Sequence, residues 1–167
     1  MFGFGKNKKV ENVEDLKRLM KKEGENFLKV AKEMADNGNL ICQEFMATAL
    51  MSLIDKAPNL EVKRKVHSDF IKYATPVATS GNAQMQFNLG ASYSKTVDTT
   101  NDRLDDDDLN RFKQARHWMK KAADQGMREA SENFISLDKL INSLESGIYL
   151  EDEDEDEDEN QEFTLLD

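Results

Sequence analysis

Apolar residues recur every three or four positions along most of the chain, a spacing typical of helices that bury one face. The first such segment follows Asn12, a residue suited to cap a helix N-terminus, and stops at Asn37 and Gly38. The pattern misses one step near Gly24. Its apolar positions are Val13, Leu16, Met20, Phe27, Ala31 and Met34. We therefore expect one amphipathic helix over about residues 12–37.

The rest of the chain predicts five more helices arranged as pairs. Their apolar patterns cover residues 40–54, 62–77, 83–93, 112–123 and 130–144. Turn glycines Gly38, Gly81 and Gly126 are 43 and 45 residues apart, a period that indicates a repeat of helix pairs. Pro76 lies about one turn before Gly81 and is expected to kink or shorten that helix.

The three glycine turns share a pattern of small residues. They read MADNGNLICQ, VATSGNAQMQ and AADQGMREAS, with Ala three residues before each Gly and Cys42, Met85 or Ala130 four residues after it. One helix hairpin cannot bury its own apolar face, so neighbouring pairs must stack. We predict an all-α protein: a short right-handed helical-repeat solenoid of about three antiparallel helix pairs over residues 11–148. A flexible N-terminus (1–10) precedes it and a disordered acidic tail (149–167) follows it.

Two segments resemble a known repeat family. GNAQMQFNLGASY (81–93) resembles the second helix of a Sel-one-like repeat, a relative of the tetratricopeptide repeat, and ARHWMKKAADQG (115–126) resembles the end of its first helix. In place of the family's short Gly-rich connection the chain has a polar stretch, 95–110. The resemblance implies a habit of binding proteins or peptides. It also implies packing roles for Ala83, Met85, Phe87, Leu89, Gly90, Tyr93, Ala115, Trp118, Ala122, Ala123 and Gly126.

The cysteine content and the apolar segments of the chain indicate its cellular compartment. A single cysteine, Cys42, excludes a disulfide framework within the chain and fits a reducing environment. The opening MFGFGKNKKV lacks the apolar segment of a secretory signal, and no stretch approaches the roughly 20 apolar residues of a membrane span. We therefore expect a cytoplasmic protein without a membrane partner.

The net charge of −10 is concentrated at the C-terminal end. Residues 151–159 read EDEDEDEDE, and with Glu162 and Asp167 they hold 11 acids. All 23 Lys and Arg precede residue 150, where the other 22 acids leave a net charge of +1. A near-neutral body lacks the basic footprint of a nucleic-acid-binding domain, so no direct nucleic-acid partner is expected.

The acidic tail has three interpretations. It can be a disordered, solubilising segment, it can engage a basic partner, or it can fold back on the Lys-rich residues 6–32. The closing NQEFTLLD adds Phe163, Leu165 and Leu166, which suit a docking peptide steered by the acids and anchored by apolar side chains.

No motif for catalysis or metal binding stands out. His67 and His117 lack a ligand or base at a useful spacing and are interpreted as surface or partly buried side chains, and Cys42 as a core residue. The four acids 105–108 lack the glycine of a calcium loop and fit a helix N-terminus instead. We expect no enzyme activity, cofactor or metal.

The best interpretation is a non-enzymatic protein-interaction module that binds a protein or peptide, basic partners included. Its binding surface is expected on the concave face lined by the first helix of each pair. The candidate residues there are Lys63, His67, Lys113, Arg116 and Lys120. Two alternatives are a bacterial immunity or antitoxin-like inhibitor and an adaptor autoinhibited by its acidic tail; an enzyme is the third class.

Overall fold

The structure, a computed structural model, describes residues 9–100 and 104–146. Within these ranges it is all helical and contains no strand, which confirms the all-α prediction. The expectations for residues 1–8 and for the tail, with Phe163, Leu165 and Leu166, lie outside the described residues. The elements are α1 (Val13–Glu23), the 3₁₀ helix η1 (Gly24–Asn26), α2 (Phe27–Asp36), α3 (Leu40–Lys56), α4 (Leu60–Thr79), α5 (Ala83–Ser94), α6 (Asp106–Ala123) and α7 (Arg128–Ser146).

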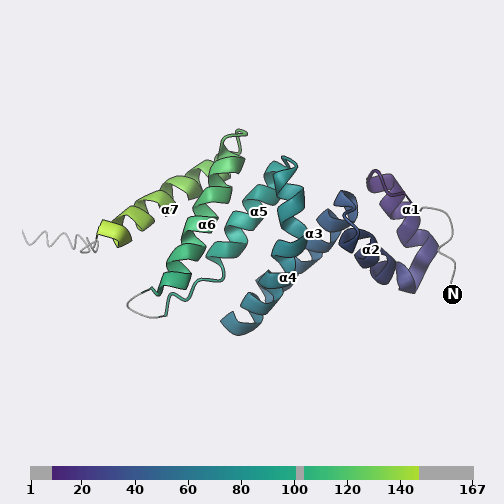
Figure 1. Cartoon of the computed structure of the whole chain (residues 1–167), viewed down its shortest axis with the longest axis horizontal. Helices are drawn as coiled ribbons and strands as arrows, with labels where there is room; N and C mark the ends of the chain where they lie inside the picture. Colours follow the sequence, from purple (N-terminus) through teal and green to yellow (C-terminus); the bar gives the residue numbers. More distant parts are fainter. Residues whose placement is uncertain (1–8, 101–103, 147–167) are drawn as a thin grey trace, which may run out of the picture.

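Consecutive helices lie side by side and succeed one another along the long axis of the molecule (Figure 1). One core cluster joins α1 to α5 with Trp118 of α6 and includes Phe70 and Leu89, while a second joins α5, α6 and α7 around Met119 and Ile141. Val10 is also buried, and its carbonyl accepts a hydrogen bond from Asn39 Nδ2 at 2.7 Å. The packed chain therefore includes a residue from the segment expected to be flexible.

Side-chain caps begin five of the seven α-helices in the described ranges. In each, the capping oxygen accepts a hydrogen bond from the backbone N–H three residues later, which satisfies one of the free donors of the first turn. The caps are Asn12, Asn39, Asn59, Asn82 and Asp105. The helix starts are thus encoded locally, including the predicted one at the acidic run 105–108.

The turn glycines adopt the conformation expected of them. Gly38, Gly81 and Gly126 have φ of 88°, 102° and 87°, a left-handed region that other residues seldom enter. Gly24 also has a positive φ of 53°, and it ends α1. The prediction of one helix over residues 12–37 is therefore wrong, because the chain changes direction at Gly24 and continues as η1 and α2.

Pro76 does not shorten its helix. Helix α4 continues past it to Thr79, although proline cannot donate the backbone hydrogen bond of that turn. Val77 and Ala78 are buried in the core, and the Ser80 N–H donates to the Pro76 carbonyl at 3.0 Å. Tertiary packing and this bond hold the last turn.

An equivalent side-chain hydrogen bond is present at the first two glycine turns, those of Gly38 and Gly81. Gln43 Nε2 donates to the Ala35 carbonyl at 3.0 Å, and Gln86 Nε2 donates to the Ala78 carbonyl at 2.9 Å. Each buried glutamine lies five residues after its turn glycine, so its side chain ties the second helix to the end of the first. The third turn has Ser131 at this position.

Helices α5 and α6 approach closely at Gly90. A Cβ added there would lie 2.8 Å from Met119 Cγ and 3.0 Å from the Ala115 carbonyl oxygen. The absence of a side chain at Gly90 therefore allows this approach. Tyr93 of α5 then lies beside residues of both α4 and α6.

Candidate functional site

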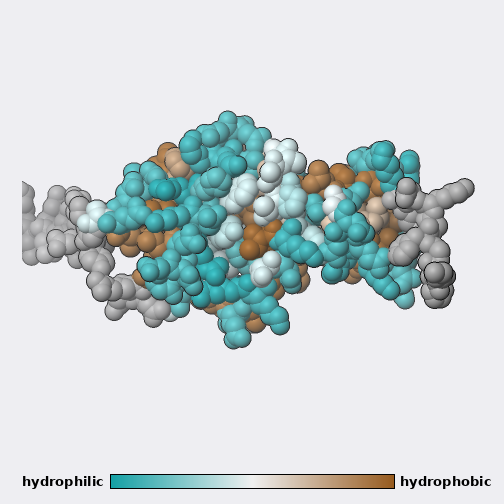
Figure 2. Space-filling view, in the orientation of Figure 1, coloured by the Kyte–Doolittle hydropathy of each residue, from teal (hydrophilic) through white to brown (hydrophobic). Residues whose placement is uncertain are grey.

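A polar pocket of about 330 Å³ lies between α4 and α6, with α5 contributing one residue. The space-filling view shows that hydrophilic residues cover most of the face in view, with apolar residues visible in separate patches (Figure 2). The pocket is lined by Arg64, His67, Ser68 and Ile71 of α4, Tyr93 of α5, and Asp107, Asn110, Arg111 and Gln114 of α6.

A buried carboxylate organises one wall of this polar pocket. Asp108 is only 2 % exposed, and it accepts hydrogen bonds from Arg64 Nη2 at 2.5 Å and from the Asp98 N–H at 3.1 Å. Arg64 Nε also donates to the Thr96 carbonyl at 3.0 Å. Arg111 Nη1 donates to Thr96 Oγ1 at 3.2 Å, and its Nε lies 3.6 Å from Asp108 Oδ1. Asp108 thus links α4, α6 and the connection between α5 and α6.

His67 lies deeper in the fold than the sequence predicted. Only 2 % of it is exposed, and its ring packs edge-on against Tyr93 at 4.7 Å and nearly parallel to Phe70 at 6.3 Å, between ring centroids. Burial, and to a smaller extent the charge of Arg111, lowers the pKa of His67 to about 4. The expectation of a surface or partly buried histidine is therefore wrong, and the imidazole is uncharged at neutral pH.

Two buried polar atoms beside this pocket have no hydrogen-bond partner among the described residues. They are Nε2 of His67 and Nε of Arg111. A buried polar atom left without a partner costs about 1–3 kcal/mol, and most such atoms in folded proteins are satisfied. The arrangement can therefore bind a group that supplies the missing hydrogen bonds.

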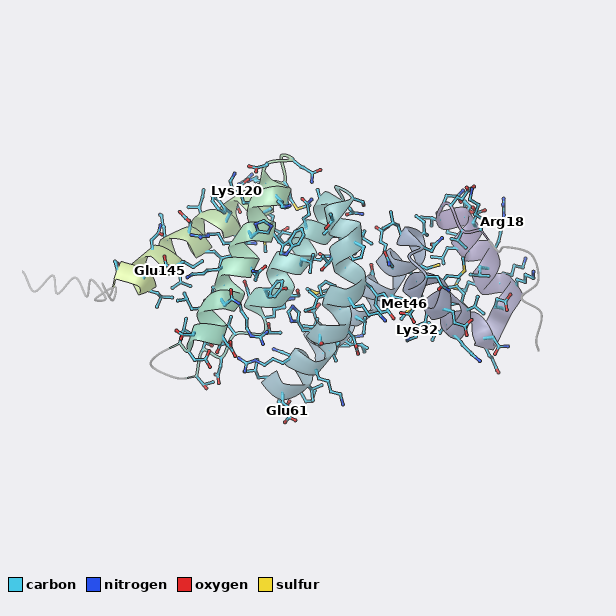
Figure 3. The ribbon with its side chains drawn as sticks, in the orientation of Figure 1. Arg18, Lys32, Met46, Glu61, Lys120 and Glu145 are labelled. Carbon is cyan, nitrogen blue, oxygen red and sulfur yellow. The ribbon has the colours of Figure 1, made fainter. Side chains whose placement is uncertain are left out.

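The three predicted binding residues of α6 all form ion pairs, two of them with acids of α7 and one with the C-cap of α6. Lys113 pairs with Glu145 at 2.6 Å, Arg116 with Asp138 at 2.9 Å, and Lys120 with Asp124 at 2.9 Å. Figure 3 places Lys120 near the end of α6 and Glu145 near the end of α7. Each of these predicted cations thus has an acidic neighbour within the chain.

The predicted residues do not form one surface. Arg116 and Lys120 line a second pocket, of about 320 Å³, together with His117, Phe134 and Asp138. His67 belongs to the polar pocket on the opposite side of α6. Lys63 is partly exposed on α4 and lines neither pocket.

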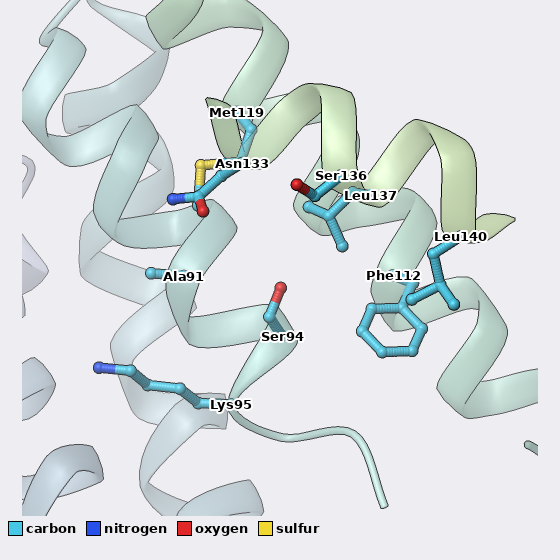
Figure 4. A pocket seen from close by; sticks show the side chains of 9 residues that line it. All are labelled: Ala91, Ser94, Lys95, Phe112, Met119, Asn133, Ser136, Leu137 and Leu140. Carbon is cyan, nitrogen blue, oxygen red and sulfur yellow. The ribbon is translucent and has the colours of Figure 1, made fainter. Parts of the chain in front are cut away.

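A third pocket, of about 360 Å³ and mostly apolar, lies over α6 between α5 and α7. Figure 4 shows the α5 side chains on one side of this pocket and those of α7 on another. Its residues are Ala91, Ser94, Lys95, Phe112, Met119, Asn133, Ser136, Leu137 and Leu140. The sequence analysis missed this pocket because the apolar members have the spacing of ordinary core residues.

Sequence reasoning also missed Arg64, Arg111 and Tyr93 as lining residues of the polar pocket. One signal was available: Asp108 and Arg111 lie three residues apart, a spacing that puts them on one helix face. Arg64 precedes Asp108 by 44 residues, and no local pattern connects them.

In the described residues, no group of three or more His, Cys, Asp or Glu side chains is arranged to hold a metal ion. Over the same ranges, none of the helices combines the length and apolar character needed to cross a membrane. Cys42 is fully buried, as predicted, and burial raises the pKa of its thiol.

Comparison of the chain with protein-family models, curated proteins and solved structures finds no match. The resemblance to Sel-one-like repeats therefore stays a prediction.

Proposed function

We propose that the chain is a non-enzymatic protein-interaction module, built as a short right-handed helical-repeat solenoid. Its protein or peptide partner binds at the polar pocket between α4 and α6. The recurring glycine turns and the matching Gln43 and Gln86 hydrogen bonds support the repeat architecture. A reducing, cytoplasmic location fits the single buried thiol of Cys42.

One observation carries the binding proposal: two polar side chains that line a surface pocket each keep a buried atom without a hydrogen-bond partner. These atoms belong to His67 and Arg111. A bound partner that hydrogen-bonds to them removes an energetic cost that the free protein bears. The pocket lies between α4 and α6, the first helices of the second and third pairs.

The same pocket is better suited to binding than to catalysis. With a pKa of about 4, His67 is a weak general base at neutral pH. The Arg64 and Arg111 side chains already bond to Asp108 or Thr96, which fixes their positions. This pocket therefore offers shaped hydrogen-bonding groups rather than an activated nucleophile.

The test obstructs either the polar pocket or the apolar pocket with a bulky side chain and measures partner binding. Ser68→Trp obstructs the polar pocket, Ser136→Trp obstructs the apolar pocket, and Thr75→Trp changes an exposed position of α4 that lines neither. A partner copurified from cells that produce the protein is expressed separately, and its affinity is measured by calorimetry for each variant.

We expect Ser68→Trp alone to weaken binding, by about tenfold or more. Equal affinity for Ser68→Trp and Thr75→Trp would remove the polar pocket from the proposal. Loss of binding with Ser136→Trp alone would move the partner to the apolar pocket. Circular dichroism confirms that each variant keeps its helical content.

A further inference from the structure

We propose that the polar pocket between α4 and α6 captures an amide group of the partner, supplied by a peptide backbone or by the side chain of Asn or Gln. This inference rests on the proposed function, because it names the chemistry by which that partner is held. It follows from three properties of the pocket: two buried atoms without a hydrogen-bond partner, its charge and its size.

The two atoms without a hydrogen-bond partner match the two ends of an amide. Arg111 Nε carries a hydrogen and can only donate. The uncharged His67 imidazole has one donor and one acceptor nitrogen, and Nε2 accepts when the proton is on Nδ1. An amide supplies a carbonyl oxygen for the arginine and an N–H for the histidine. With the proton on Nδ1, a carboxylate satisfies only the first.

The charge of the pocket also favours a neutral group over an anion. Two guanidinium groups, Arg64 and Arg111, are faced by the buried carboxylate of Asp108 and the exposed carboxylate of Asp107. These charges balance, so the pocket has no surplus positive charge to offset the desolvation of an anionic ligand.

The pocket opens to the surface and is large enough for a group of this size. Its volume of about 330 Å³ exceeds that of one peptide unit, and Tyr93 and Ile71 provide apolar walls beside His67. Because Nε2 of His67 and Nε of Arg111 are buried, the side chains that cover these two atoms have to move to admit the amide. Hydrogen bonds formed in such a site are strengthened by the low local dielectric.

The test uses nuclear magnetic resonance on the ¹⁵N-labelled full chain. The chain has only two histidines, so the imidazole nitrogens of His67 can be followed with exposed His117 as an internal control. Three capped amino acids serve as probes: N-acetyl-alanine, N-acetyl-asparagine and N-acetyl-aspartate, each as its methylamide. They present a backbone amide alone, an added carboxamide and an added carboxylate.

We expect saturable shifts of His67 Nε2 with the asparagine probe and none at His117. Equal affinity of the alanine probe identifies the backbone amide as the captured group, and affinity lower by about fivefold identifies the carboxamide. Tighter binding of the aspartate probe than of the other two would overturn the proposal in favour of an anion site. No shift with any probe would overturn it as well and leave an ordered water as the partner of these atoms.

A matched pair of variants tests the donor. Arg111→Lys keeps the charge and removes the Nε donor, whereas Arg116→Lys makes the same change on the far side of α6, in the second pocket. Arg111→Lys is expected to weaken the asparagine probe by about fivefold, and Arg116→Lys to leave it unchanged. Equal effects of the two variants would contradict the donor role.

The outcomes separate this inference from the proposed function. If Ser68→Trp abolishes partner binding but no amide probe binds, the partner uses the pocket by other chemistry and only this inference fails. If the probes bind but the partner tolerates Ser68→Trp, the pocket is an amide site and the proposed function fails.

Discussion

Acidification is expected to destabilise the protein through His67. Burial, and secondarily the charge of Arg111, lowers the pKa of this histidine from 6.5 to about 4. In the unfolded chain the imidazole binds a proton near pH 6.5, whereas in the fold it stays neutral until about pH 4. The unfolded state therefore binds more protons between these values, and stability decreases as the pH falls through this window.

The magnitude follows from the difference between the two pKa values of His67. It corresponds to roughly 3 kcal/mol of stability that is present in full above about pH 6.5 and lost by about pH 4. Small domains are typically stable by about 5–15 kcal/mol, so one histidine accounts for a large share. Within the part of the chain that the structure describes, no acidic side chain pairs with the charged imidazole: the rings of Phe70 and Tyr93 pack against it, and Arg111 repels it.

Urea unfolding followed by circular dichroism at pH 7, 6, 5 and about 4 measures this effect. His67→Gln removes the titrating group, and His117→Gln makes the same change at an exposed position. The wild type and His117→Gln are expected to lose stability in parallel, and His67→Gln to lose about 3 kcal/mol less. Carboxylates contribute equally to all three chains. A parallel loss in His67→Gln would refute a buried, neutral histidine.

Three further predictions concern packing and charge. Asp108→Asn is expected to lower the free energy of unfolding, measured with urea, by about 3 kcal/mol because it breaks a buried ion pair. Asp107→Asn, at the adjacent exposed position, is expected to lower it by under about 0.5 kcal/mol. Similar losses in the two variants would show that Asp108 is not buried. Gly90→Ala is expected to lower stability by about 1–2 kcal/mol, because the cost of the clash between its Cβ and α6 exceeds the gain in helix propensity. A stabilised variant would contradict the close approach of α5 and α6. Cys42 is expected to react with a thiol reagent far more slowly in the folded than in the urea-unfolded chain, because it is buried and its pKa is raised; equal rates would place it at the surface.

The limits of helices could be predicted where the signal is local. Asn12 and the acids at 105–108 begin helices because their side chains bond to the backbone within the next turn. Gly38 ends one because it can adopt a positive φ. The break at Gly24 was missed because a single glycine within a helical pattern is compatible with a continuous helix, and only the packing of α1 against α3 shows the change of direction.

The binding residues were harder to predict because their roles depend on partners far away in the chain. Lys113 and Arg116 were expected to be available to a partner, yet each pairs with an acid of α7. Asp108 was grouped with three exposed acids, yet it is buried against Arg64, which lies 44 residues earlier. Composition and periodicity cannot distinguish these cases, because charge pairing across helices depends on how the helices pack.

The sequence by itself determined that this protein is helical, where most of its helices begin, and that its turns recur at glycines. These features are local, because capping, backbone conformation and apolar spacing act within a few residues. Only the tertiary structure decided that His67 is buried and that Arg64, Tyr93 and Arg111 surround one pocket. These residues come from three different helices, and the close approach of α5 to α6 at Gly90 helps to bring them together.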